Sequence, residues 1–165
     1  MVQGKSPRVI TWNEISDLTK QVGAQLKRNY PSVDCIVGLA RGGLIPAVQL
    51  SHILDVPMIT VNFSLRDNKV STNLLEDALM SKLDKYKHIA IVDDISDSGK
   101  TMHAVDVILQ DRISQYSVDN DGALYNKFVY CSLLHKPTSM FCPKVIGEII
   151  PEVDLDVWIH FPWEV

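Results

Sequence analysis

Residues 89–101 read Ile-Ala-Ile-Val-Asp-Asp-Ile-Ser-Asp-Ser-Gly-Lys-Thr and carry the clearest structural signal in the chain. The apolar run, with His88 before it, is typical of a strand covered on both faces, as strands of parallel sheets are. It delivers Asp93 and Asp94 to the carboxyl end of that strand, and small polar residues then lead into a helix that begins near Gly99. The stretch therefore predicts a strand, a polar turn and a helix in direct succession.

The sequence on both sides continues this alternation of strands and helices. Thr11-Trp-Asn-Glu14 forms a capping box, and apolar residues at helical spacing follow it. We expect helices at about 12–29, 44–54, 74–83 and 99–113, and strands at 35–39, 58–63, 88–92, 128–134, 144–150 and 157–161. Residues 64–73 are rich in polar turn formers and are expected to form a mobile surface loop, and 111–127 an exposed excursion. This order predicts one α/β domain over 1–165, with a doubly wound, mainly parallel sheet flanked by helices and ligands beyond the carboxyl ends of its strands.

The composition argues against several classes of protein. With 46% hydrophobic residues, 22% charged residues and a net charge of -4, the chain is not expected to have nucleic acid or an anionic membrane as its main partner. No apolar run approaches the roughly 20 residues of a membrane span, and the amino terminus shows no signal-peptide core, so a cytoplasmic location is expected. Cys35, Cys131 and Cys142 are too widely spaced for a disulfide framework or a zinc site, and the five histidines lack metal-ligand spacing.

The turn after the acidic strand has the chemistry of a phosphate site. Backbone N–H groups at the start of a helix, with the Ser98 and Thr101 hydroxyls and the unhindered Gly99, suit a phosphate monoester. The two preceding carboxylates suit ribose hydroxyls or a hydrated Mg²⁺. Neither a Walker A loop nor a dinucleotide-binding glycine pattern is present. An ordinary acidic strand-to-helix turn is the alternative.

This segment resembles the signature with which type I phosphoribosyltransferases bind phosphoribosyl pyrophosphate (PRPP). The signature has four hydrophobic residues, two acids, two variable residues and then Asp-Ser/Thr-Gly-x-Thr, and nearly every position matches. The resemblance implies the family fold with a small hood region, a Mg²⁺ cofactor held by Asp94, and Asp97 as the catalytic residue beside N7 of the base. It implies that PRPP is bound by Arg41, Gly42, Lys69, Asp93, Asp94, Ile95, Ser96, Asp97, Ser98, Gly99, Lys100 and Thr101.

A second element, Gly38-Leu-Ala-Arg-Gly-Gly43, places the Arg41 guanidinium among glycines at the end of a predicted strand. Backbone amides and a fixed fork of donors could hold pyrophosphate there. The element is similar to the family's pyrophosphate loop, which often contains a non-proline cis peptide, and we expect one at Ala40–Arg41. A structural turn is the alternative. In the loop expected to close over the site, Ser64-Leu65 stands where the family commonly has Ser-Tyr, and Lys69 is a weak match to its basic residue.

Two further segments narrow the resemblance to xanthine-guanine phosphoribosyltransferases. They are His135-Lys-Pro137 and the terminal Asp156-Val-Trp-Ile-His-Phe-Pro-Trp-Glu164. The resemblance implies that Lys136 donates to the oxygen at purine position 6, that Trp158 stacks on the base and that the Ile159 backbone meets the position 2 substituent. Taken alone, Trp158 would be interpreted as a core aromatic and Lys136 as a solvated surface lysine.

Together these segments imply a Mg²⁺-dependent purine phosphoribosyltransferase that joins guanine, xanthine or hypoxanthine to the ribose 5-phosphate of PRPP and releases pyrophosphate. The resemblance also implies a homodimer or homotetramer whose partners are PRPP and a purine base. One alternative is a phosphoribosyltransferase for adenine, orotate or uracil, and another is a regulatory protein that keeps the fold as a PRPP sensor. Lys136 and Trp158 argue against the first, and an intact Asp97 argues against the second.

Overall fold

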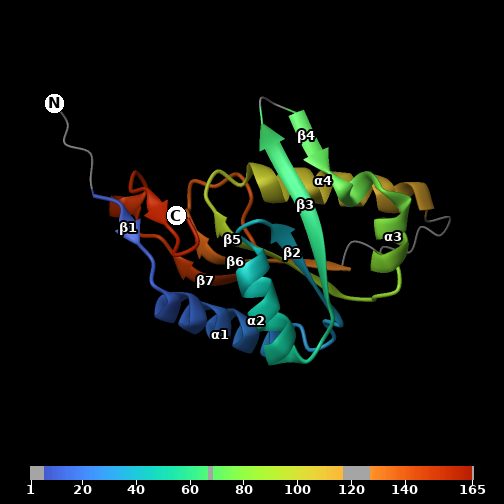
Figure 1. The fold of residues 1–165 in the computed structure, drawn as a ribbon, viewed down its shortest axis with the longest axis horizontal. Coiled ribbons are helices and arrows are strands. Elements are labelled where there is room, and N and C mark those ends of the chain that lie inside the picture. The colour runs from blue at the N-terminus through green and yellow to red at the C-terminus, as the bar shows by residue number, and fades with distance from the viewer. Residues whose placement is uncertain (1–5, 67–68, 117–126, 165) are drawn as a thin grey trace.

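The computed structural model describes residues 6–66, 69–116 and 127–164, and its centre is a six-stranded sheet (Figure 1). The strand order is β4-β3-β2-β5-β6-β7, and all neighbours are parallel except β3 and β4. The strands are β2 (Cys35–Ala40), β3 (Met58–Arg66), β4 (Lys69–Thr72), β5 (Ile89–Ser96), β6 (Phe128–His135) and β7 (Val145–Ile149). The predicted α/β fold with a mainly parallel sheet is confirmed.

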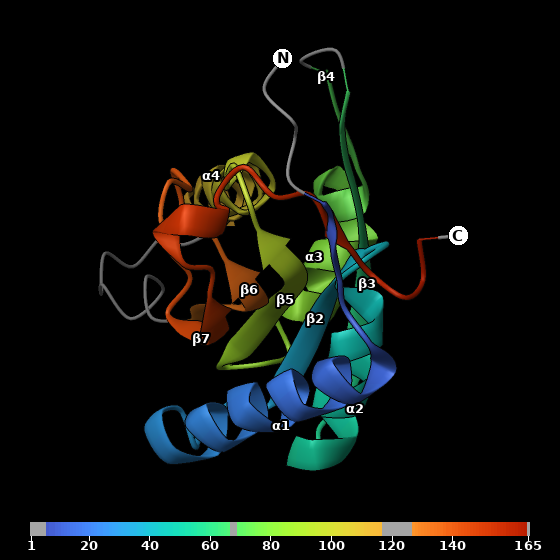
Figure 2. The same ribbon diagram turned by 90° about the vertical axis from the view of Figure 1, so that its left-hand side faces the viewer.

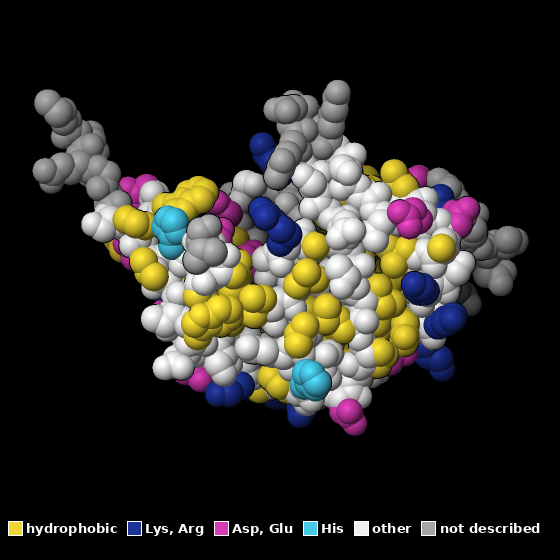
Figure 3. Space-filling view, viewed as in Figure 1, with side chains coloured by type: hydrophobic (Ala, Val, Ile, Leu, Met, Phe, Trp, Pro, Cys, Tyr) yellow, Lys and Arg dark blue, Asp and Glu magenta, His cyan; other side chains and the backbone are white. Residues whose placement is uncertain are grey.

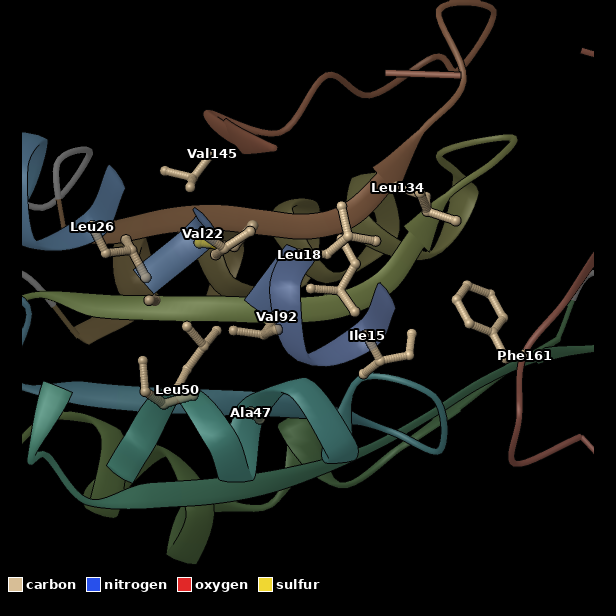
Figure 4. Packing of buried hydrophobic residues seen from close by; sticks show 14 of the residues in the cluster. Ile15, Leu18, Val22, Leu26, Ala47, Leu50, Val92, Leu134, Val145 and Phe161 are labelled. Carbon is tan, nitrogen blue, oxygen red and sulfur yellow. The ribbon is translucent and has the colours of Figure 1, made fainter. Parts of the chain in front are cut away.

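Helices cover both faces of this sheet (Figure 2). They are α1 (Trp12–Asn29), α2 (Leu44–Leu54), α3 (Asp77–Leu83) and α4 (Lys100–Tyr116), with 3₁₀ turns at Asn73–Leu75 and Glu152–Asp154. Successive β5 residues alternate between two cores: Val92 packs with α1 and α2 (Figure 4), and Ile91 packs with α3 and α4. Because both faces are buried, β5 is a continuous apolar run rather than an alternating one.

Helix α1 begins and ends where its sequence predicts. Thr11 Oγ1 accepts a hydrogen bond from Glu14 N (3.2 Å), and Glu14 Oε2 accepts one from Thr11 N (2.8 Å), which completes the capping box. The bonds from Thr11 hold the pKa of the Glu14 carboxyl below its ordinary value. Ile15, Leu18 and Val22 are buried on the face that packs against the sheet. In the parts of the chain that the structure describes, no helix is long and apolar enough to cross a membrane.

The expected surface loop at 64–73 is instead largely a β-hairpin. β3 continues to Arg66, and β4 returns antiparallel to it, with Leu65 opposite Val70. The ladder pairs backbone groups that an irregular loop would leave to water. The loop prediction was wrong because these strands depend on backbone pairing rather than on a buried face: Leu65 is 37% and Val70 43% exposed.

Other expected boundaries were corrected by the structure. The helix predicted at 74–83 begins only at Asp77, after a 3₁₀ turn. The last strand is shortened to β8 (Ile159–His160), which pairs in parallel with β1 (Arg8–Val9) in a separate small sheet. Figure 1 shows this small sheet at the end of the molecule toward which β2 and β5 point. Of the expected excursion at 111–127, the start belongs to α4 and residues 117–126 lie outside the described residues.

Candidate active site

The acidic strand end closes β5 in the middle of the sheet. Asp93 and Asp94 are half-buried, and a backbone N–H fixes one oxygen of each: Asp93 Oδ1 accepts from Asp94 N (3.1 Å), and Asp94 Oδ1 accepts from Ile95 N (2.8 Å). Burial, together with the charge of Glu164, raises the pKa of Asp94 to about 6. Burial and then the charge of Asp94 raise the pKa of Asp93 well above its ordinary value. Both shifts mark a place where a cation would stabilise the ionised carboxylates.

The arginine loop meets the acidic pair from the neighbouring strand. β2 lies beside β5 in the sheet, and the chain after it carries the predicted cis peptide at Ala40–Arg41. A Cβ atom on Gly42 would lie 1.9 Å from Oδ2 of Asp94, so only a residue without a side chain fits between the loop and this carboxylate. Arg41 itself is exposed. The structure therefore places Gly42 directly on Asp94, with the Arg41 guanidinium in the adjoining loop open to a ligand.

The polar turn between β5 and α4 has the form of an anion cradle. Gly99 is buried and has a φ of 77°, a left-handed conformation that favours glycine. Helix α4 begins at Lys100, and the N–H groups of its first turn have no carbonyl partner within the helix. Asp97 and Ser98 are exposed, and Thr101 is half-buried. The predicted phosphate-binding residues thus surround one helix N-terminus, whose dipole favours an anion.

The segment after β6 reaches the same turn. Lys136 Nζ lies 3.0 Å from Asp97 Oδ1, and Lys136 N donates to Ser96 O at 3.0 Å. The Lys136 side chain is only 11% exposed, so the interpretation as a solvated surface lysine is wrong. The two residues meet because β5 and β6 are parallel neighbours, with Ser96 opposite His135 at their carboxyl ends. A cation from one strand end is thereby paired with a carboxylate from the next.

The C-terminal segment contributes an exposed aromatic ring. Trp158 is 64% exposed, which excludes the core-aromatic interpretation. Its carbonyl accepts a bond from Arg8 N (2.9 Å), and Ile159 is the register partner of Arg8. Because backbone groups alternate in direction along a strand, the N–H and C=O of Ile159 face away from β1. Among the described residues, no hydrogen bond, ion pair or ring contact joins Trp158 to Lys136 or Asp97.

Comparison with known proteins agrees with this geometry. The model of the phosphoribosyl transferase domain matches residues 11–113. The chain belongs to this family. The curated xanthine-guanine phosphoribosyltransferase of Cereibacter sphaeroides is 26% identical over 161 residues, which are 94% of this chain and 85% of that protein. A solved purine phosphoribosyltransferase from Pyrococcus horikoshii is 28% identical, with a TM-score of 0.72 over 98% of this chain and 95% of that one. A Helicobacter pylori xanthine-guanine-hypoxanthine phosphoribosyltransferase, 24% identical, shares the fold with a TM-score of 0.73 over 96% and 93%.

One residue predicted to bind PRPP cannot be placed in the site of this phosphoribosyl transferase domain. Lys69 opens β4 opposite Arg66, and its side chain lies outside the described residues, so its role stays a prediction. Two contacts were missed by the sequence analysis. Arg8 donates to both carboxylate oxygens of Glu148 on β7, at 2.5 and 3.0 Å, and no local signal announces this pairing of distant residues. Ser139 packs beside the cradle, and the proline two residues earlier indicates only that a turn is there.

Proposed function

We propose that this domain transfers the phosphoribosyl group of PRPP to guanine, xanthine or hypoxanthine, giving the nucleoside monophosphate and pyrophosphate. The observation that carries the proposal is the pair of Lys136 and Asp97, 3.0 Å apart beside the anion cradle. An oxopurine presents O6 and N7 on one edge. A lysine ammonium that donates to O6 and a carboxylate that accepts a hydrogen bond from N7–H complement that edge when the free base carries its imidazole proton on N7.

The same pair supports an oxopurine over other bases. Adenine carries an amino donor at position 6, which would face the ammonium of Lys136 and find no acceptor in it. Such an unmet buried donor costs about 1–3 kcal/mol. Orotate and uracil lack the second ring of a purine and would leave Asp97 without its N7 partner. Trp158, exposed beside the backbone edge of Ile159 that faces away from β1, offers the apolar face on which a two-ring base stacks.

In the proposed reaction, N9 of the base attacks the anomeric carbon of PRPP. The new N9–C1′ bond forms while the C1′–O bond to pyrophosphate breaks, and pyrophosphate leaves with the electron pair. Asp97 accepts the proton that N7 loses as charge shifts through the base. The cradle at residues 97–101 holds the 5-phosphate, and the Arg41 loop holds the leaving pyrophosphate. Positioning and electrostatics are the main contributions of the protein.

The acidic strand end fits a magnesium ion. Mg²⁺ is usually held by one or two carboxylates together with substrate phosphates and water. Asp93 and Asp94 supply such carboxylates, each with one oxygen already fixed by a backbone N–H. Oδ2 of Asp94 also faces the Gly42 loop, in a space that a Cβ atom would fill. Asp94 is the proposed ligand, and the ion would neutralise charge on the pyrophosphate when bound.

A single domain over residues 1–165, a cytoplasmic location and assembly as a homodimer or homotetramer belong to the same proposal. Hydrophobic side chains on the face shown in Figure 3 support assembly: they gather over α2, where Val48 is 46% exposed. Exposed apolar surface of this kind is often covered by a second chain.

The test is nucleotide formation from PRPP and Mg²⁺ with guanine, xanthine, hypoxanthine, adenine, uracil and orotate in parallel. Oxopurines should be turned over, and Asp97→Ala should lower turnover roughly 10²- to 10⁴-fold because proton transfer is lost. Lys136→Met should lose the preference for oxopurines over adenine. Lys20→Met is the matched control, because Lys20 is an exposed lysine that pairs with Asp17 on α1. Turnover of another base alone would overturn the base assignment, and PRPP binding without turnover of any base would favour the sensor.

A further inference from the structure

A short turn after β6 ties the base side of the site to the anion cradle. The turn spans residues 136–139, has proline as its second residue and is closed by a bond from Ser139 N to Lys136 O (2.9 Å). Lys136 N donates to Ser96 O at 3.0 Å, and Met140 N donates to Ser98 O at 3.1 Å. These two backbone bonds hold the turn against the loop that begins the cradle.

Ser139 supplies the central side chain of this contact. Its Oγ lies 2.8 Å from Oγ of Ser96, and the two hydroxyls lie 2.9 and 2.8 Å from Phe141 O. Phe141 N also donates to Ser139 Oγ at 3.3 Å. The two hydroxyl protons can therefore be shared among three acceptors, which are the two serine oxygens and Phe141 O, so each serine hydroxyl has a hydrogen-bond partner. Ser96 is 2% exposed, so water is poorly placed to replace a lost partner.

The turn also limits where the cradle can lie. A Cβ atom on Gly99 would come within 2.4 Å of Ser139 Oγ and 2.6 Å of Phe141 N, so the turn and the cradle touch at Gly99. Ser139 is therefore in contact with the cradle through its side chain and with Lys136 through its backbone N–H. Ser139 thus lies between the cradle and the residue proposed to contact the base.

We infer that Ser139 is a positioning residue that couples the base subsite to the phosphoribosyl subsite. The inference rests on the proposed function. Ser139 acts by holding Lys136 and the cradle in one relative position, without touching either substrate. PRPP in the cradle then fixes Lys136 for the base and raises the affinity for the base. By linkage, the base raises the affinity for PRPP by the same factor.

The experiment measures this factor. In 9-deazaguanine a carbon replaces the attacking N9, so the analogue cannot form the glycosidic bond and its affinity can be measured by calorimetry with and without saturating PRPP and Mg²⁺. The control is Ser51→Ala, which removes a hydroxyl that bonds to Val48 O (2.9 Å) within α2. Loss of the hydrogen bonds of the Ser139 hydroxyl predicts that Ser139→Ala lowers the gain in affinity from PRPP about threefold to tenfold. Ser139→Cys, a weaker hydrogen-bonding group of similar shape, should fall between, and Ser51→Ala should match the wild type.

The outcomes separate the coupling from the function itself. A merely structural role for Ser139 predicts equal losses of base affinity with and without PRPP, which leaves the gain unchanged. An equal gain in wild type and Ser139→Ala, including no gain in either, overturns the inference even if oxopurines are turned over. A wild type that binds PRPP but no purine shows that the proposed function fails, and the coupling with it. Thermal unfolding of each variant checks the fold, and Ser139→Cys serves as the test if Ser139→Ala does not fold.

Discussion

Replacing Asp94 with asparagine should stabilise the folded protein at neutral pH. Burial raises the pKa of this carboxyl from an ordinary 3.8 to about 6. This difference corresponds to about 3 kcal/mol of free energy, by which the ionised carboxylate destabilises the native state. Asparagine has nearly the same shape, carries no charge and keeps an oxygen for the bond from Ile95 N. The variant should therefore regain most of this free energy of unfolding, and it should lose Mg²⁺-dependent PRPP binding.

The sign of the pH dependence identifies the cause. Below about pH 4 the Asp94 carboxyl is protonated in both folded and unfolded chains, so wild type and Asp94→Asn should differ little. Between pH 4 and 6 the unfolded chain releases its proton first, which destabilises the wild-type native state. The difference in unfolding free energy should rise over this range, and it should rise further at the higher pH where Asp93 ionises, because, beyond burial, the charge of Asp94 raises the pKa of Asp93. Urea unfolding followed by tryptophan fluorescence at pH 4.5, 6 and 8 measures it.

The matched control is Asp17→Asn. The Asp17 side chain is 70% exposed and, among the residues that the structure describes, pairs only with Lys20 in the neighbouring turn of α1. Its removal should therefore change stability by less than about 0.5 kcal/mol at any of these pH values. The reasoning is refuted if Asp94→Asn is no more stable than the wild type at pH 8. It is also refuted if the two differ by the same amount at pH 4.5 and at pH 8, because a packing effect does not titrate.

Two further substitutions test the surroundings of this carboxylate and of the base subsite. Gly42→Ala would place a Cβ 1.9 Å from Asp94 Oδ2, so PRPP affinity measured by calorimetry should fall at least about tenfold, and wild-type affinity would contradict the close approach. Arg8→Met removes the bidentate contact with Glu148, which is partly exposed, so urea unfolding should show a loss of about 1 kcal/mol. The KM for the base should also rise, because β1 pairs with β8, the strand that follows Trp158. If the Arg8–Glu148 pair is the cause, adding Glu148→Gln to Arg8→Met should lower the free energy of unfolding little further.

The parts of the fold that follow from neighbouring residues were predictable. The capping box at Thr11 and Glu14 sets the start of α1 because both partners lie within one turn of the chain. The acidic strand end and the cradle occupy a continuous stretch, 93–101, so a strand, a turn and a helix start are enough to arrange them. The cis peptide at Ala40–Arg41 is different: it was expected from the family resemblance, and no residue type at that position requires it.

The errors have a common physical origin in pairing between segments. The hairpin of β3 and β4 is held by a ladder along exposed strands, so its residues lack the apolar alternation that burial imposes. β8 is only two residues long, and its partner β1 lies about 150 positions earlier in the chain. The ion pair of Arg8 with Glu148 likewise joins residues that no spacing rule connects.

This difference between contacts of neighbouring residues and contacts of distant segments explains why the sequence predicts the proposed phosphate site more completely than the proposed base site. The proposed phosphate site consists of backbone N–H groups and small side chains at one helix start, and these follow one another in the chain. The proposed base site needs three separate segments: the turn at Lys136, the C-terminal stretch at Trp158 and Ile159, and the β1 strand at Arg8 that pairs with this stretch. Each of these three segments can change in sequence without a change in the cradle, provided that the segments still meet at the end of the sheet. A change of base specificity in this fold should therefore arise through those contacts rather than through the signature that binds PRPP.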